Sequence, residues 1–266
     1  MKVVLFCGGM GTRLREHSET IPKPLVVIGY RPIIWHLMKY YAHYGHKDFI
    51  LCLGYRGNQI KDYFVNYAEW TSSDFVLSNG NRTVDPIQSD VREWRITFVE
   101  TGLHSNIGER LLAVRKHLAG EETFFANYSD ALSDLPLQAF TEAAARKNVI
   151  ANLVAVKPWQ LYHTVSARED GIITHVGPMR DSAYLLNGGF FLFRQEIFDH
   201  IRPGEDLVEE PFRRLVEKEQ LYAYEHSGFW AAMDTFKDKI TFDRMDGRGD
   251  TPWKVWAQSR GTGRDA

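Results

Sequence analysis

Short apolar runs alternate with amphipathic segments through the first two thirds of the chain, and this alternation constrains the fold more than any other feature. The apolar runs have the length of buried strands, and the segments between them place apolar residues at helical spacing. Strands that alternate with helices build a mostly parallel sheet covered on both faces. The sequence therefore predicts a doubly wound, Rossmann-like α/β fold. The expected strands are 3–6, 49–53, 95–99, 123–127 and 152–156, and the expected helices are 31–41, 58–67, 107–117 and 137–146.

The pattern loosens after residue 158. A hairpin is expected at 165–174, because Asp-Gly at 170–171 is a strong turn signal. A glycine-led strand at 187–193 and a helix at 211–219 follow. These segments predict a small β-rich extension of the main domain. From about residue 247 the chain is rich in Gly, Asp and Arg, and we expect it to fray as a C-terminal tail, 247–266.

The composition is that of an ordinary globular protein, and its charge gives no sign of a nucleic-acid or membrane partner. The 266 residues are 44% hydrophobic and 25% charged, and the net charge is −2. A nucleic-acid or anionic-membrane binder relies on an excess of Lys and Arg, so neither partner is expected. The sequence shows neither an apolar stretch of membrane-spanning length nor a secretory leader. Cys7 and Cys52 lie in expected strands and are interpreted as small buried hydrophobes, so we expect a cytoplasmic protein.

A glycine-rich segment follows the first expected strand. Gly8, Gly9 and Gly11 let the backbone approach a ligand closely and present N–H groups to an anion. Arg13 and Lys23 add two cations. Ligands of parallel α/β sheets bind beyond the carboxyl ends of the strands, where this loop would lie. We interpret it as a triphosphate-binding loop; the alternative is a flexible surface turn.

The loop matches neither of two common phosphate-binding motifs. A P-loop requires Gly-x-x-x-x-Gly-Lys-[Ser/Thr], and no lysine follows Gly11. A dinucleotide-binding fingerprint requires a further glycine at the position that Leu14 occupies. The segment therefore indicates another class of nucleotide site.

Two acidic residues follow expected strands and suit a magnesium ion. Asp130 comes after the strand that ends near Tyr128, and Asp234 lies in a second apolar segment. Magnesium prefers one or two carboxylates together with phosphate oxygens and water. A turn residue is an equal alternative for Asp130. Asp134 is interpreted as a cap of the helix that begins near Leu137.

No motif for covalent catalysis is visible. The sequence shows no Ser-His-Asp or Cys-His pattern, and its histidines lack zinc-binding spacing. His36, His43 and His46 are interpreted as helix-surface or buried residues. A triphosphate site with cations and a metal can accelerate phosphoryl or nucleotidyl transfer by alignment and charge stabilisation alone.

Motifs along nearly the whole chain are those of one enzyme family. The matching segments are 8–14, 22–24, 33–38, 47–50, 101–111, 187–191 and 226–235. On these motifs, residues 1 to about 256 resemble the nucleotide-sugar pyrophosphorylases, the family of sugar-phosphate nucleotidyltransferases. The greatest similarity is to its glucose-1-phosphate cytidylyltransferase branch. The resemblance implies a glycosyltransferase-A-like fold.

The resemblance also implies the reaction and the role of each matching residue. A sugar 1-phosphate oxygen would attack the α-phosphorus of CTP and release pyrophosphate. Arg13, Lys23, Asp130 and Asp234 would be catalytic, with Asp130 and Asp234 holding Mg²⁺. The nucleotide-binding residues would be Gly8, Gly9, Gly11, Thr12, Arg13, Lys23, Gly102 and Arg110, and the acceptor-binding residues Asn187 and Gly188.

The implied organisation is one domain, 1–256. Residues 1–135 would form its nucleotide-binding half and residues 136–246 its acceptor-binding half. The expected partners are CTP and a small phosphorylated acceptor, with no nucleic acid and no membrane. A homo-oligomer is expected because the family is usually oligomeric.

Three segments depart from the family pattern. Ser129-Asp130-Ala131 replaces Gly-Asp-Gly, the stretch 175–181 lacks the Glu-Lys pair that contacts the acceptor, and 159–164 replaces Arg-Phe-Gly. Lys157, Arg168 or Arg180 could substitute for the lost lysine, although for each one separately the interpretation as a solvated surface cation is favoured.

Three hypotheses follow from these departures. The first is a cytidylyltransferase that makes CDP-glucose. The second keeps this chemistry with another sugar phosphate, a cyclitol phosphate or a phosphonate as acceptor. The third is a catalytically silent nucleotide-binding regulatory protein.

Overall fold

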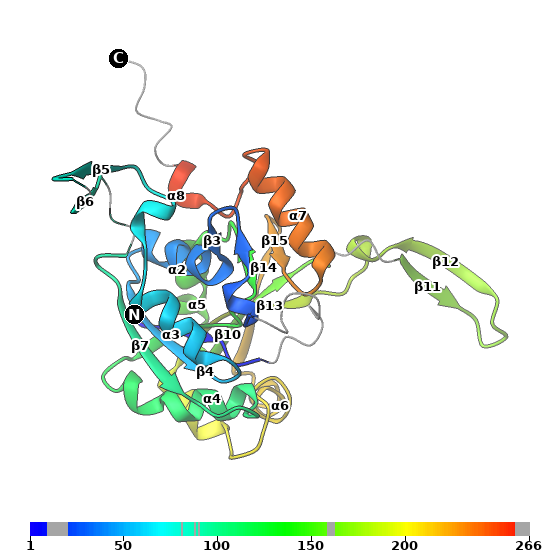
Figure 1. Ribbon diagram of the computed structural model, residues 1–266. Helices are drawn as coiled ribbons and strands as arrows, with labels where there is room; N and C mark the ends of the chain where they lie inside the picture. Colours follow the sequence, from blue (N-terminus) through cyan, green and yellow to red (C-terminus); the bar gives the residue numbers. More distant parts are fainter. Residues whose placement is uncertain (10–20, 81, 88, 90, 159–162, 259–266) are drawn as a thin grey trace.

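A seven-stranded sheet forms the centre of the molecule (Figure 1). The structure is a computed structural model, and it describes residues 1–9, 21–80, 82–87, 89, 91–158 and 163–258. The strand order is β14-β10-β13-β8-β1-β4-β7. Its strands are β1 (Val3–Phe6), β4 (Asp48–Leu53), β7 (Arg95–Glu100), β8 (Thr123–Asn127), β10 (Ala151–Val156), β13 (Leu186–Arg194) and β14 (Leu221–His226).

Most pairs in this sheet are parallel. Strand β1 pairs in parallel with β4 and β8, β4 with β7, and β10 with β14. Strand β13 alone among the seven runs antiparallel to its neighbours, β8 and β10. The predicted doubly wound, mostly parallel α/β fold is therefore confirmed.

Helices cover both faces of the sheet. Alternate side chains of a strand point to opposite faces, and in β1 they enter two separate apolar cores: Val3 and Leu5 pack in one, Val4 and Phe6 in the other. The helices are α2 (Ile33–His43), α3 (Gly57–Val65), α4 (Ile107–Val114), α5 (Leu137–Lys147), α6 (Glu210–Glu217), α7 (Phe236–Gly247) and α8 (Val255–Gln258). No helix among the described residues is both long and apolar enough to cross a lipid bilayer.

Short helical turns and two-stranded pairs complete the fold. The turns are η2 (Lys23–Leu25), η3 (Glu69–Thr71), η4 (Arg115–Leu118), η5 (Met179–Asp181) and η6 (Gln195–His200). The paired strands are β2 (Val27–Ile28) with β3 (Arg31–Pro32), β5 (Phe75–Ser78) with β6 (Thr83–Pro86), β9 (Ala131–Ser133) with β15 (Trp230–Ala232), and β11 (His163–Ala167) with β12 (Ile173–Pro178). Figure 1 shows the β11–β12 hairpin extending away from the body of the molecule, as the predicted β-rich extension.

Several boundaries differ from those expected. The helix expected from Arg31 begins at Ile33, because Arg31 and Pro32 form strand β3. The 107–117 helix ends at Val114 and continues as the tighter turn η4. Strands β5, β6, β9, β14 and β15 and helix α7 were not predicted.

The expectation that the chain frays from about residue 247 is wrong for residues up to 258. Trp253 is only 1% exposed and lies in the core with Phe242 and Phe229. Helix α8 follows it. The tryptophan fixes this segment because burying so large an apolar surface outweighs the propensity of the polar residues around it.

Candidate active site

Lys23 lies between two carboxylates that are far apart in the sequence. Its Nζ is 2.7 Å from Oδ2 of Asp130 and 2.7 Å from Oδ1 of Asp234. Lys23 begins turn η2, which follows the glycine-rich loop. The structure therefore brings together three of the four residues expected to be catalytic.

The pairing of β9 with β15 places the two carboxylates side by side. Ala131 is opposite Ala232 in this pair, so Asp130 stands just before one strand and Asp234 shortly after the other. The backbone N–H of Met233 donates to the carbonyl of Asp130 over 2.8 Å. The backbone thus fixes the separation of the two side chains.

The charges of this triad are coupled. Loss of water around Asp130 raises its pKa, and Asp234 raises it further, while Lys23 opposes both effects. Burial by itself would lower the pKa of Lys23, but the two carboxylates outweigh burial and raise it. Two carboxylates with one ammonium leave one negative charge in excess, which favours an additional cation.

A cavity of about 290 Å³ opens beside Lys23 and Asp130. Cys7 and Gly9 from the loop after β1, and Tyr128 and Ser129 from the loop after β8, also line it. Both loops follow the carboxyl ends of adjacent parallel strands, where α/β sheets bind ligands. Cys7 is buried and its thiol pKa is raised to about 12 by that burial, so it stays a neutral thiol, as expected for a small buried hydrophobe.

Ser129 explains the glycine that the family motif has at this position. Its φ is +66°, in the left-handed region that favours glycine. The backbone N–H of Ser129 donates to Oδ1 of Asn127 over 2.9 Å, which helps to hold the turn. The substitution therefore keeps the backbone path that presents Asp130 to the cavity.

The side chain of Arg110 donates hydrogen bonds to the loops at one end of the sheet. Its guanidinium donates to the carbonyl oxygens of Gly8, Leu53 and Gly102 at 2.9, 3.1 and 3.0 Å, and to Oγ1 of Thr101 at 2.7 Å. These acceptors lie just after β1, at the end of β4 and just after β7, and Arg110 is 3% exposed.

The same guanidinium explains the glycine at position 8. A Cβ on Gly8 would overlap the side chain of Arg110. The glycine-rich loop is therefore shaped in part by a buried internal cation. Contacts of Gly8, Gly9, Gly102 and Arg110 with a nucleotide stay predictions.

The residues expected to face the acceptor adjoin Tyr128 and Trp230. The Asn187 amide donates to the Tyr128 hydroxyl over 3.3 Å, and the Trp230 indole donates to the Gly188 carbonyl over 2.8 Å. Asn187 is therefore bonded to a residue that lines the cavity beside Asp130, although Asn187 itself does not line it.

Two of the cations considered as replacements are engaged elsewhere. Lys157 donates to the carbonyl of Ser182 over 2.7 Å. Arg168 pairs with Asp170 over 3.1 Å near the turn of the β11–β12 hairpin, which Figure 1 shows extending from the body of the molecule. Gly11, Thr12, Arg13 and residues 159–162 lie outside the described residues, so their predicted roles stay predictions.

The interpretation of Asp134 as a helix cap is wrong. Pro136 precedes α5, and no side chain caps that helix. Oδ1 of Asp134 is instead 2.9 Å from Nε2 of the buried His226, which also approaches the carbonyl of Phe229 at 3.3 Å. Sequence reasoning missed His226 as a partner, because His226 ends β14 and Asp134 follows β9, and no local pattern relates residues so far apart in the sequence.

A model of one protein family matches most of the chain. That family is described as nucleotidyl transferase, and the match covers residues 2–241. The chain belongs to the nucleotidyl transferase family. The enzyme class expected from the motifs is confirmed: the chain is a nucleotidyltransferase.

Relatives match it over nearly its whole length. A probable glucose-1-phosphate cytidylyltransferase of Bacillus subtilis is 36% identical over 258 residues, which cover 96% of this chain and 100% of the relative. The glucose-1-phosphate cytidylyltransferase of Salmonella typhimurium is 35% identical over 257 residues, with the same coverage. The resemblance to the cytidylyltransferase branch is therefore confirmed.

Solved structures support the fold. UDP-glucose pyrophosphorylase complexed with UDP-glucose superposes with a TM-score of 0.68 at 17% identity, covering 93% of this chain and 98% of that one. HddC from Yersinia pseudotuberculosis superposes with a TM-score of 0.65 at 17% identity, covering 92% and 99%. At such identities the likeness concerns the fold alone.

Proposed function

We propose that this nucleotidyltransferase is a Mg²⁺-dependent cytidylyltransferase that transfers CMP from CTP to a sugar 1-phosphate, with glucose 1-phosphate as the default acceptor. The observation that carries the proposal is the Lys23 ammonium held between Asp130 and Asp234 at the cavity beside Gly9. The names of the two full-length relatives favour CTP and glucose 1-phosphate as the substrates.

Asp130 and Asp234 fit a magnesium ion. They already surround one cationic centre, the ammonium of Lys23, at 2.7 Å from each. Two carboxylates completed by phosphate oxygens and water are a typical magnesium environment. A bound Mg²⁺ would neutralise part of the triphosphate charge.

The protein groups then have separable tasks. Backbone N–H groups of the glycine-rich loop would bind phosphate oxygens, and Lys23 and Arg13 would stabilise the charge that develops on the α-phosphate. The acceptor phosphate is already an anion and requires no general base. Catalysis therefore rests on alignment and charge stabilisation.

The direct test is pyrophosphate release. The purified protein is incubated with CTP, Mg²⁺ and glucose 1-phosphate, and pyrophosphate and CDP-glucose are quantified. We expect both in equal amounts, and neither without acceptor or with excess EDTA. CTP binding with no pyrophosphate from any acceptor would instead identify a catalytically silent nucleotide-binding protein.

A different acceptor is the second candidate. The stretch 175–181 lacks the Glu-Lys pair of the family, and Lys157 and Arg168 are held by Ser182 and Asp170. Losing a cation beside a phosphate removes a charge-assisted hydrogen bond. A panel of sugar phosphates, cyclitol phosphates and phosphonates in the same assay tests this candidate, and robust turnover with glucose 1-phosphate rejects it.

Assembly and location complete the proposal. We propose a cytoplasmic homo-oligomer. Light scattering of the purified protein gives its mass in solution, and a monomer at micromolar concentration would contradict the proposed assembly.

A further inference from the structure

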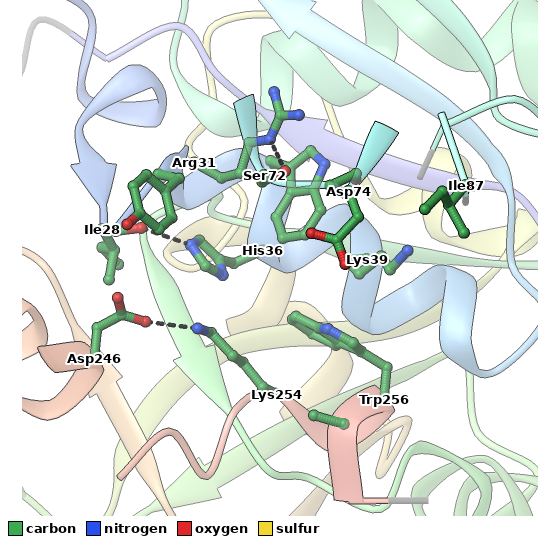
Figure 2. Close-up of a pocket in the computed structure, with 14 residues that line it drawn as sticks. Ile28, Arg31, His36, Lys39, Ser72, Asp74, Ile87, Asp246, Lys254 and Trp256 are labelled. Carbon is green, nitrogen blue, oxygen red and sulfur yellow. Dashed lines mark hydrogen bonds and ion pairs between the residues drawn. The ribbon is translucent and has the colours of Figure 1, made fainter. Parts of the chain in front are cut away.

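A second pocket lies between the N-terminal half of α2, the segment after η3 and the C-terminal residues around α8 (Figure 2). Its volume is about 460 Å³, within the usual range for small-ligand pockets. None of the residues that line it lines the cavity beside Lys23 and Asp130. It is therefore a separate pocket and is not used by the proposed reaction.

Arg31 places a buried positive charge in the wall of this pocket. The residue is 3% exposed, and its guanidinium donates to Oγ of Ser72 at 2.6 Å and to the carbonyl of Ala68 at 2.8 Å. Longer contacts reach the Tyr63 hydroxyl and the Glu69 carbonyl. Among the described residues all these partners are neutral oxygens, so hydrogen bonds satisfy Arg31 while no carboxylate neutralises it.

The described residues that line the pocket carry a positive excess. Arg31, Lys39 and Lys254 line it together with Asp74 and Asp246. Lys254 and Asp246 neutralise each other at 2.6 Å. A buried guanidinium without a counter-charge favours an anion, and phosphate is the anion whose geometry its fork of N–H groups matches.

His36 presents an unused hydrogen-bond acceptor. It is 2% exposed, and its Nε2 lies 3.1 Å from the carbonyl of Ile28. Burial lowers its pKa to about 4, so the ring is neutral at pH 7 and Nε2 must carry the proton that faces the carbonyl. Nδ1 is then an acceptor, and it has no partner among the described residues. Figure 2 shows the ring between Ile28 and Lys254.

Aromatic rings supply the apolar surface of the pocket. Trp35 and Trp256 meet edge to face, with their centroids 6.0 Å apart, and the ring of His36 lies 6.4 Å from that of Trp256. Such faces pack against sugar or base rings, while polar groups at the margin fix their orientation.

We propose that this pocket binds a phosphate monoester that carries a polar ring. The phosphate compensates the charge of Arg31, a hydroxyl or amino group of the ligand donates to Nδ1 of His36, and the ring packs against Trp256. A sugar phosphate and a nucleoside monophosphate share this chemistry. The proposal concerns a site apart from the active site and does not depend on which acceptor the enzyme uses.

The test measures binding in a protein whose active site is weakened. The Lys23→Ala variant is titrated calorimetrically with CMP, with glucose 6-phosphate and with inorganic phosphate alone. We expect CMP or glucose 6-phosphate to bind with one site per chain, and the stronger of the two identifies the source of the phosphate. Inorganic phosphate should bind at least about tenfold more weakly, because it lacks the ring.

Variants of the pocket wall complete the experiment. In the Lys23→Ala background, Arg31→Gln and Trp256→Leu should each weaken binding by about tenfold or more, as expected for losing a charge-assisted contact or a packing face. Lys237→Met, an exposed lysine of α7 outside the pocket, is the matched control and should have no effect. If a thermal melt shows that Arg31→Gln is not folded, the effect of Trp256→Leu on ligand binding still tests the proposal.

Three results would overturn the proposal. One is the absence of binding by both ring-bearing ligands in the Lys23→Ala protein. Another is binding that neither Arg31→Gln nor Trp256→Leu alters. The third is a dimer in light scattering that Trp256→Leu dissociates and that binds neither ligand, which would show that a second copy of the chain covers the pocket.

Discussion

Lys23 contacts the two carboxylates that are expected to hold a metal, so each residue of the triad sets the charge of the others. Asp130 has 27% of its side chain exposed and carries a raised pKa, whereas Lys23 keeps its proton because both carboxylates attract it. This arrangement costs stability at neutral pH, because an ionised Asp130 is less favourable in the folded chain than in the unfolded one. Active sites commonly have such costs.

Asp234→Asn should remove activity without unfolding the protein. The change deletes one of the two carboxylate charges that the metal needs while it keeps the side-chain volume. We expect pyrophosphate release to fall by about 100-fold or more, with a thermal midpoint close to that of the parent. Asp243→Asn, which removes an exposed carboxylate paired with Lys239 on α7, is the control. Unchanged turnover in Asp234→Asn would refute the metal role.

Asp130 should also produce a pH dependence of stability. Because its pKa is higher in the folded state than in the unfolded state, folding binds a proton between these two values. The free energy of unfolding should therefore decrease as pH rises through that interval. Asp130→Asn should flatten this part of the curve and leave the variant slightly more stable than the parent at pH 7. Urea unfolding of both proteins from pH 3 to pH 8 measures this free energy, and identical pH curves for the two proteins would contradict the role of Asp130.

At the level of elements, the β9–β15 pair positions the carboxylates. Asp134 and Ser133 at the end of β9 hold the loop before β15: the backbone N–H of Asp134 donates to the Phe229 carbonyl at 3.2 Å, and the Ser133 hydroxyl donates to the same oxygen at 2.7 Å. His226 adds the contact with the Asp134 side chain. Movement of β15 would therefore move Asp234.

Asp134→Ala should loosen this pair. It leaves the buried His226 without its side-chain partner, and such a loss costs about 1–3 kcal/mol of unfolding free energy. The turnover number should fall as well, because Asp234 is positioned less firmly. Asp134→Asn keeps an acceptor oxygen and should retain most of the stability and activity. Equal effects of the two substitutions on turnover would show that the hydrogen bond does not position β15. Thermal melts and pyrophosphate assays give both quantities.

At the level of the whole molecule, one arginine joins the ends of three strands. Arg110 comes from α4 and contacts the residues that end or follow β1, β4 and β7. A parallel sheet leaves backbone carbonyls at its strand ends that need donors. Arg110 supplies them and leaves no space for a side chain at Gly8.

Arg110→Met should destabilise the whole fold. Methionine has a similar length but no donors, so oxygens at three strand ends each lose one hydrogen-bond donor, and of these, among the described residues, only the Leu53 carbonyl keeps other donors, the N–H and hydroxyl of Thr101. We expect a cost of about 2–4 kcal/mol. We expect a lower midpoint in urea with an unchanged slope. Arg115→Met on the following turn, where the arginine is exposed, is the control. Loss of CTP affinity without loss of stability would contradict this structural role and support direct contact with the base.

The local sequence pattern was enough to predict the helices and strands whose apolar residues recur at a clear helical or strand spacing. All strands of the central sheet except β14, and the helices α2 to α6, were expected within a few residues of their observed bounds. Strands β9 and β15 escaped prediction because each has only three residues, and α7 because its apolar residues do not follow one stripe. The burial of Trp253 is not visible in the local pattern because it depends on packing against residues such as His36 of α2, which is distant in the sequence.

The sequence by itself determined the fold class and the choice of the candidate reactive groups. These features are local signals. They are the strand and helix periods, the glycine-rich loop and the acidic residues after apolar runs, and each can be recognised within a short stretch of the chain. Only the tertiary structure decided that Lys23 lies between Asp130 and Asp234. It also decided that Asp134 contacts His226 and that the buried Arg110 donates hydrogen bonds to the loops at the strand ends. Each of these contacts joins residues whose proximity depends on the packing of several strands, which no short stretch of sequence encodes.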